Sequence, residues 1–182
     1  MLLIIGLGNP GKQYTKTRHN IGFRAADVIS DRLSFSSFVE NSKFKAEIAS
    51  GNAFDDKVTI AKPTTYMNLS GEAVGAIAQY YKIPLSKIIV IHDDIDLKLG
   101  EVRVKQGGGH AGHKGLRSID GHIGKDYWRL RIGVGRPENK DDVPDYMLQD
   151  FSKEEMVVMD DVIAGVLDVI KGILEAHCLP SA

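Results

Sequence analysis

Residues 88–96 read IIVIHDDID, a β-branched apolar run that passes directly into acidic residues. Branched side chains suit the pleated surface of a sheet, and an unbroken apolar run is typical of a strand buried on both faces. The first four residues therefore predict a central strand, and the polar residues from His92 onward predict the loop that leaves it.

Further strand and helix patterns lie on both sides of this run. Strands are expected at residues 2–5, 44–49, 57–61, 101–105 and 128–134, helices at 21–33, 70–80, 115–123 and about 152–176, and a serine-rich link at 34–42. Asn20 can cap the first helix, and Ser152 with Glu155 forms a capping box at the start of the last one. Strands that alternate with helices predict an α/β fold with a largely parallel or mixed sheet.

The bulk properties restrict the class of protein. A chain of 182 residues can bury one substantial core but is short for two domains, so one domain over residues 1–182 is expected. No run approaches the roughly 18 apolar residues of a membrane span, and residues 2–5 lack the basic flank of a signal peptide. Cys178 has no second cysteine to pair with, which is compatible with a reducing cytosol.

Charge is distributed unevenly along the chain, although the formal net charge is −1. Residues 98–136 hold nine basic and three acidic side chains, whereas residues 138–182 hold three basic and eleven acidic ones. A basic middle suits a polyanionic partner, and the acidic end is typical of a solvated outer face. Where charge is the only evidence, such clusters are more often solvated faces than binding surfaces, so the charge pattern needs support from other residues.

Polar residues follow four of the expected strands, at residues 6–20, 62–71, 92–96 and 135–137. Ligands bind at the carboxyl ends of the strands in open α/β sheets, so the loops that leave these strands form the candidate site. If the strands are neighbours, one edge of the sheet gathers an imidazole, carboxylates, carboxamides and basic groups.

Residues 6–11 match the pattern G-x-G-x-x-G of dinucleotide-binding proteins, a weak signal by itself. Pro10 removes one backbone donor, and the polar residues 12–19 have no apolar stripe that would start a phosphate-binding helix. No second strand ends in an acidic residue about 20 positions later. A nicotinamide or flavin cofactor is therefore not expected.

Other common enzyme classes lack their motifs. The sequence contains no G-x-S-x-G, no Walker A pattern and no H-E-x-x-H. His110 and His113 are spaced so that they could ligate a metal, but zinc would need further ligands, and the flanking glycines suit a flexible loop. We expect neither a metal nor a cofactor.

Hydrolysis by an activated water is compatible with the residues at the candidate edge. A histidine suits the role of general base near neutral pH when an acceptor fixes its tautomer and stabilises the cation that forms. Asp93 could do this for His19, although the spacing leaves Asp94 and Asp96 open and His19 taken alone could be an ordinary loop residue.

Five segments in this order closely resemble bacterial peptidyl-tRNA hydrolases, and the resemblance runs from residue 1 to about 150. The segments are residues 6–20, 62–71, 92–97, 107–115 and 129–133. The resemblance implies a single α/β domain with a mixed, twisted central sheet flanked by helices. It also implies a cytoplasmic monomer without cofactor or obligate protein partner, which cleaves the ester between a peptide and the terminal ribose of tRNA.

The resemblance assigns roles to the polar residues of the site. His19 would be the general base, and Asp93 would be the carboxylate that orients it. Asn9 and Asn68 are common turn formers, but their donors and acceptors could also bind a peptide backbone or help to hold an oxyanion. By resemblance, both engage the peptide part of the substrate.

The glycine-rich loop, residues 107–112, is the expected contact with the tRNA acceptor stem. A glycine-rich stretch that enters a helix can present backbone N–H groups to phosphate. Five basic residues surround it in sequence: Lys105, Lys114, Arg117, Arg129 and Arg131. By resemblance, Tyr14 and Tyr66 flank the site near the terminal nucleotide. The family usually has asparagine where this chain has Lys114, and lysine adds charge but loses an acceptor.

A second hypothesis is a non-catalytic RNA-binding protein on the same scaffold. The joint presence of Asn9, His19, Asn68 and Asp93 favours catalysis, because a binding surface alone needs no general base. The final helix could be a lid, as in the family, or a packing element, and its long apolar stripe favours packing.

Overall fold

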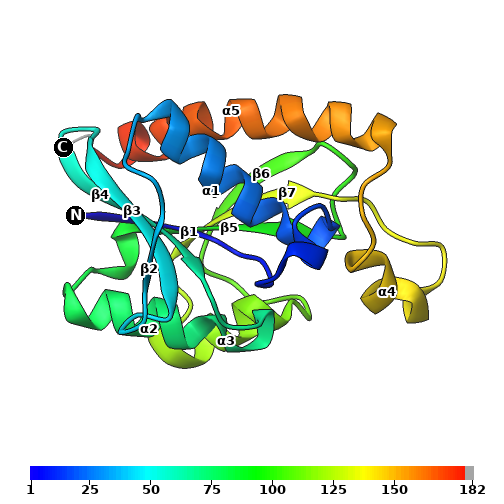
Figure 1. The fold of residues 1–182 in the computed structure, drawn as a ribbon, viewed down its shortest axis with the longest axis horizontal. Coiled ribbons are helices and arrows are strands. Elements are labelled where there is room, and N and C mark those ends of the chain that lie inside the picture. The colour runs from blue at the N-terminus through cyan, green and yellow to red at the C-terminus, as the bar shows by residue number, and fades with distance from the viewer. Residues whose placement is uncertain (179–182) are drawn as a thin grey trace.

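Seven strands form one sheet in the order β2-β3-β4-β1-β5-β7-β6 in the computed structural model (Figure 1). The structure describes residues 1–178, with side chains through residue 176, so residues 179–182 and the side chain of Cys178 lie outside the described residues. The strands are β1 (Leu2–Gly6), β2 (Val39–Asn41), β3 (Ala46–Ala53), β4 (Asp56–Pro63), β5 (Ile88–Asp94), β6 (Val102–Gln106) and β7 (Trp128–Gly133). The longer helices are α1 (Ile21–Arg32), α2 (Ser70–Tyr80), α3 (Lys114–Ile123), α4 (Val143–Met147) and α5 (Lys153–Cys178).

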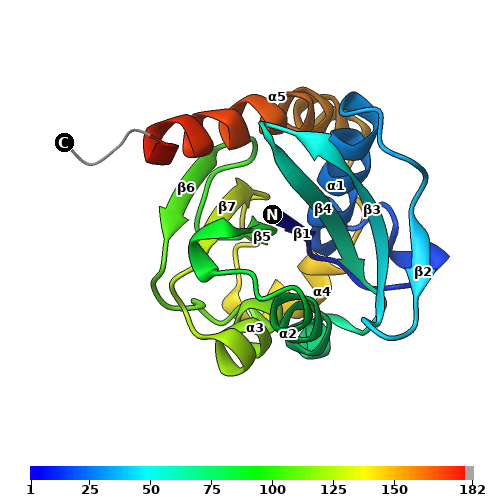
Figure 2. The same ribbon diagram turned by 90° about the vertical axis from the view of Figure 1, so that its left-hand side faces the viewer.

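The sheet is mixed and twisted, which confirms the expected fold class (Figure 2). Strands β4, β1, β5 and β7 run parallel to one another, whereas β2 and β3 at one edge and β6 at the other pair antiparallel. The four parallel strands therefore end at the same side of the sheet. The loops that leave them meet there.

Helices cover both faces of the sheet, with α1 and α5 on one side and α2 and α3 on the other (Figures 1 and 2). The central strand β5 serves both layers, because Ile89 and Ile91 join the core under α1 and α5 while Ile88 and Val90 join the core under α2 and α3. All four side chains are fully buried, and each contributes about 1.5–3 kcal/mol by leaving water. This two-sided burial explains the unbroken apolar run.

Two local expectations met different outcomes. The capping box of α5 is present, since the backbone N–H of Ser152 donates to Glu155 and the N–H of Glu155 donates to the Ser152 hydroxyl. The link at residues 34–42, expected to lack regular structure, contains the short strand β2. Its polar, largely exposed residues show no strand periodicity, and pairing with β3 is what orders them.

No helix among residues 1–178 is both long enough and apolar enough to cross a bilayer.

Candidate active site

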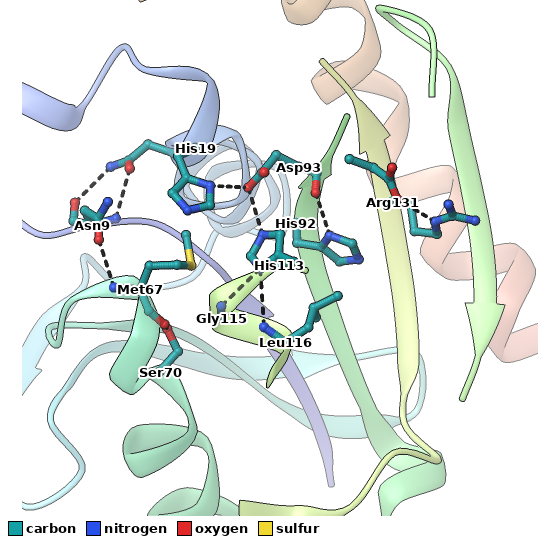
Figure 3. Close-up of polar contacts among 12 residues, drawn as sticks. Asn9, His19, Met67, Ser70, His92, Asp93, His113, Gly115, Leu116 and Arg131 are labelled. Atoms are coloured by element: carbon teal, nitrogen blue, oxygen red, sulfur yellow. Dashed lines mark hydrogen bonds and ion pairs between the residues drawn. The ribbon is translucent and has the colours of Figure 1, made fainter. Parts of the chain in front are cut away.

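His19 and Asp93 meet at the carboxyl end of the parallel strands, as Figure 3 shows. His19 lies on the short 3-10 helix η2 (Arg18–Asn20), just before α1, and Asp93 is the penultimate residue of β5. The His19 Nδ1 atom is 2.9 Å from Asp93 Oδ1, and the two side chains are 15% and 4% exposed. An ionised carboxylate only accepts hydrogen bonds, so Nδ1 carries the proton and Nε2 is left with a free lone pair.

The pair shifts both pKa values in directions that suit a base and its partner. Burial alone would raise the pKa of Asp93, but the electrostatic influence of His19 and His113, together with the N–H groups that they donate, outweighs it and holds that pKa well below its usual range. Burial and the nearby Lys114 act to lower the pKa of His19, but the Asp93 carboxylate prevails and raises it. The carboxylate therefore stays ionised and favours the protonated imidazole.

His113 is a part of the site that the sequence reasoning missed. Its Nε2 lies 3.1 Å from the same Oδ1 atom of Asp93, while its Nδ1 accepts the backbone N–H groups of Gly115 and Leu116 at 3.1 and 3.3 Å (Figure 3). The ring thus caps α3 and points its Nε2–H at the carboxylate. The sequence signals were the spacing of His110 and His113, which was considered only for a metal, and the position of His113 two residues before the helix expected at 115–123.

This cap corrects one expectation about the glycine-rich loop. The first N–H groups of α3 were expected to be available to a phosphate, but His113 already accepts those of Gly115 and Leu116. The glycine-rich loop is also bound to β7, because the buried Arg129 guanidinium donates to the carbonyl groups of Gly108 and Gly109. Arg129, one of the five basic residues that surround this loop in sequence, is therefore buried and presents no exposed charge there.

A third histidine completes the buried surroundings of Asp93. The ring of His92 packs edge-on against His113, with 5.1 Å between the centroids, and its Nδ1 donates to the backbone carbonyl of Asp93 at 2.7 Å. Complete burial and the proximity of His113 lower the pKa of His92 to about 4. His92 is therefore neutral near pH 7 and adds no charge that would compete with His19.

Asn9 is held by backbone contacts on two sides. Its Oδ1 accepts the N–H of Met67 at 2.8 Å, and its own N–H and carbonyl group are bound by the side chain of Asn20, each at 2.9 Å. Asn20 therefore does not cap α1 with its side chain, and that prediction was wrong. Because Oδ1 is engaged, Asn9 offers its Nδ2 donors to a substrate.

The remaining expected substrate residues lie in the segments that follow β1 and β4. Asn68 is exposed on the 3-10 helix η3 (Met67–Leu69), beside the residue that Asn9 holds. Tyr66 precedes it and is 57% exposed, and Tyr14 is half-buried at the end of the 3-10 helix η1 (Lys12–Tyr14). In the part of the chain that the structure describes, none of the three hydrogen-bonds to His19 or Asp93.

The structure separates the acidic residues that the sequence left equivalent. Asp94 pairs with Arg131, with 2.8 Å between Oδ2 and Nε, and Asp96 pairs with Arg136 at 3.4 Å. Only Asp93, among these three, faces a histidine. The Arg131 charge, expected to bind tRNA, is thus partly neutralised, whereas Lys105 and Lys114 are exposed.

The glycine pattern near the N-terminus has a packing role. A Cβ atom on Gly6 would lie 2.3 Å from the carbonyl oxygen of Gly22, and one on Gly22 would lie 2.5 Å from that of Ile91. Glycine at both positions lets α1 cross closely over β1 and β5. This close crossing brings η2, and with it His19, to the end of β5.

Three side chains of the site also lie close enough together to be considered as ligands of a metal ion. The ligand atoms of His19, Asp93 and His113 all lie within 4.8 Å of one another. However, His113 Nδ1 accepts two backbone N–H groups, so the proton resides on Nε2, where a metal would need a lone pair. The arrangement is that of a hydrogen-bonded network around one carboxylate.

Comparisons with known proteins agree on one family. A sequence model of the family described as peptidyl-tRNA hydrolase matches residues 3–181. Peptidyl-tRNA hydrolases of Rickettsia bellii and Aliarcobacter butzleri are 55% and 52% identical, over 96% and 97% of this chain and 94% and 93% of theirs. The crystal structure of peptidyl-tRNA hydrolase from Acinetobacter baumannii superposes with a TM-score of 0.92 at 38% identity, covering 97% of this chain and 90% of that one.

Proposed function

The chain belongs to the peptidyl-tRNA hydrolase family, and from that premise we propose that His19 activates the water that cleaves the ester of its substrate. The ester joins a peptide, or an N-blocked aminoacyl group, to the 3′-terminal ribose of tRNA. Attack of water on its carbonyl carbon releases the peptide and frees the tRNA. The contact between His19 Nδ1 and Asp93 Oδ1 carries the proposal.

His19 acts as general base through Nε2. With Nδ1 holding a proton against Asp93, the lone pair of Nε2 is free to take a proton from water as the oxygen attacks. The imidazolium that forms lies beside an ionised carboxylate in a largely buried site, where their attraction is stronger than in water. The same proton can then pass to the departing ribose oxygen.

His113 holds Asp93 in place throughout this cycle. Its Nε2–H donates to the same oxygen that accepts the hydrogen bond from His19, and its tautomer is fixed by the backbone of α3. Asp93 therefore keeps both hydrogen bonds and its orientation while His19 accepts a proton at Nε2. The catalytic pair is in this way attached to the end of the glycine-rich loop.

The asparagines and the aromatic residues bind the substrate around this pair. Asn9 offers Nδ2 to the peptide or to the developing oxyanion, and Asn68 contributes its exposed amide from η3. Tyr14 and Tyr66 flank the terminal nucleotide, where an aromatic ring can stack on a base. We place the acceptor stem along the glycine-rich loop, beside Lys105 and Lys114, and expect a cytoplasmic monomer.

The reaction is expected to proceed without a metal. Purified protein should release acetylated amino acid from N-acetylaminoacyl-tRNA at the same rate with and without EDTA. In the His113–Asp93–His19 network, the lone pair of His19 Nε2 accepts the proton from water, and His113 Nε2 carries a proton, so neither nitrogen is needed to hold a metal. Unblocked aminoacyl-tRNA serves as the control substrate. A rate that EDTA abolishes and Zn²⁺ restores would contradict metal independence, and no release at all would leave only tRNA binding.

Lys105 should contribute to tRNA affinity through charge. Its ammonium group lies over Gly108, where a Cβ atom would be 2.6 Å from it, so it stands at the glycine-rich loop. Lys105→Gln is expected to lower the slope of log Kd against log salt concentration by about one, as for the loss of one phosphate contact. Arg131→Gln should lower it less, because Asp94 already neutralises part of that charge.

Lys57→Gln, at the opposite end of the parallel strands, is the matched control for this measurement. Binding of deacylated tRNA over a series of salt concentrations gives the three slopes. A slope that Lys105→Gln leaves unchanged would place the acceptor stem elsewhere.

A further inference from the structure

Arg18, the residue before His19, is buried although it carries a full charge. Its side chain is only 8% exposed. A buried cation is costly unless hydrogen bonds and counter-charges replace its hydration. Among the described residues, the hydrogen-bond partners of its guanidinium all lie in one segment far along the chain, residues 146–155, which we call the clamp segment.

The guanidinium uses two of its nitrogens to hold this segment. Nη1 donates to the carbonyl oxygens of Tyr146, Gln149 and Asp150 at 3.3, 3.4 and 3.2 Å. Nη2 donates to both carboxylate oxygens of Glu155, at 3.1 and 2.8 Å. The ring of Tyr146 also lies 4.1 Å from the guanidinium carbon, in cation–π contact.

The backbone around Arg18 is bound to the same segment. The N–H of Arg18 donates to the carbonyl oxygen of Gln149 at 3.1 Å, and the N–H of Phe151 donates to that of Lys16 at 3.4 Å. Thr17 and Asp150 form an isolated antiparallel bridge between these bonds. The loop that carries His19 is therefore joined to the clamp segment by main chain and side chain together.

The clamp segment is itself anchored to the strand next to β5. The hydroxyl of Tyr146 donates to the carbonyl oxygen of Val134 at 2.7 Å, directly after β7. The N–H of Val134 in turn donates to the carbonyl oxygen of Asp94, the residue after Asp93, at 3.1 Å. The contacts thus form a closed circuit from Asp93 through β7, Tyr146 and Arg18 back to His19.

From this circuit we infer that Arg18 is a positioning residue, which holds His19 at bonding distance from Asp93. The inference rests on the proposed role of His19 as general base. Arg18 acts without contacting the substrate, by setting the position of its neighbour His19. A planar guanidinium can bind a carboxylate with two bonds and reach carbonyl groups at the same time, which a lysine ammonium cannot do.

The test compares two arginines that both join the start of the chain to α5. Arg18→Lys and Arg18→Gln remove the clamp, whereas the control Arg24→Gln removes the ion pair with Asp160, at 2.9 Å, between the first turn of α1 and the third turn of α5. Both Arg18 variants should lower kcat by about 10- to 100-fold, as expected when a catalytic group is displaced by about 1 Å. KM should stay near the parent value, and Arg24→Gln should change neither constant.

A spectroscopic readout separates positioning from a loss of fold. The Nδ1–H proton of His19, assigned by its absence in His19→Ala, should lose its downfield NMR resonance in the Arg18 variants while circular dichroism stays that of the folded protein. Glu155→Gln, which removes one charge from the clamp, should show an intermediate loss of kcat. If the Arg18 variants do not fold, Glu155→Gln decides the question in the same way.

The failure of this inference can be distinguished from failure of the proposed function. Folded Arg18 variants, or Glu155→Gln, with the kcat and the Nδ1–H resonance of Arg24→Gln would show that Arg18 only stabilises the fold. An active His19→Ala protein would overturn the role of His19 as base, whatever Arg18 does. The NMR readout reports the position of His19 independently of catalysis.

Discussion

Replacing His19 by alanine should lower kcat by about 10²–10⁴-fold, the range that a general base contributes. The substitution removes the Nε2 lone pair and leaves the Asp93 carboxylate with the hydrogen bond from His113. Release of acetylated amino acid from N-acetylaminoacyl-tRNA under single-turnover conditions measures the effect. Since the general base is needed for chemistry and not for contact with the acceptor stem, the affinity for tRNA should stay near that of the parent protein.

His122→Ala is a suitable control for this substitution. His122 is exposed on α3, and its ring bonds to the carbonyl oxygen of Ser118, one turn earlier in the same helix. It should leave both kcat and tRNA affinity unchanged. If His19→Ala retained most of the activity, or lost tRNA binding in proportion to activity, His19 would not be the base.

Replacing Asp93 by asparagine should have an effect of similar size, a loss in kcat of up to about 10⁴-fold. An amide presents a donor as well as an acceptor, so it can turn the His19 ring to the tautomer that has its proton on Nε2. The imidazolium would also lose the negative charge that stabilises it. His113 would lose its charged acceptor as well, so the start of α3 would be held less firmly.

The same substitution should change the dependence of activity on pH. The base must be neutral, so kcat/KM falls as pH drops through the pKa of His19, which Asp93 raises above the usual 6.5. In Asp93→Asn the carboxylate that raises the pKa of His19 is gone, while burial and the charge of Lys114 still lower that pKa. The acidic limb of the residual activity should therefore move to lower pH.

Asp94→Asn is the matched control, because Asp94 is the adjacent carboxylate but pairs with Arg131. Its acidic limb should stay near that of the parent protein in a profile of kcat/KM against pH. Coincident profiles for the parent and Asp93→Asn would show that Asp93 does not act on the base.

Local sequence patterns predicted much of the fold. The run at residues 88–91 identified the central strand, because burial on both faces demands apolar residues at consecutive positions. The pair Ser152 and Glu155 identified the start of α5, because its hydrogen bonds join residues three positions apart. The strand β5 nevertheless extends to Asp94, since its backbone pairs with β7 whatever the side chains are.

The residue types of the site were predictable from their positions in the sequence, but the choice of Asp93 as the partner of His19 came only from the family resemblance, and the structure confirms that they are in contact. Asp93, Asp94 and Asp96 are equivalent in the sequence, and only the neighbours supplied by β7 and by η2 distinguish them. Asn20 was a reasonable cap by type and position, yet it binds the backbone of Asn9, eleven residues away.

The sequence by itself determined the α/β class, the central strand, the beginning of the last helix and the set of residues able to activate water. Only the tertiary structure decided that His113 shares the carboxylate of Asp93 and that Arg18 fastens the loop of His19 to residues 146–155. The physical reason is the separation of the contacting residues along the chain. Helix caps and apolar runs are encoded among neighbours, whereas these contacts join residues 20 and more than 120 positions apart, and exist only after the sheet has brought its strand ends together.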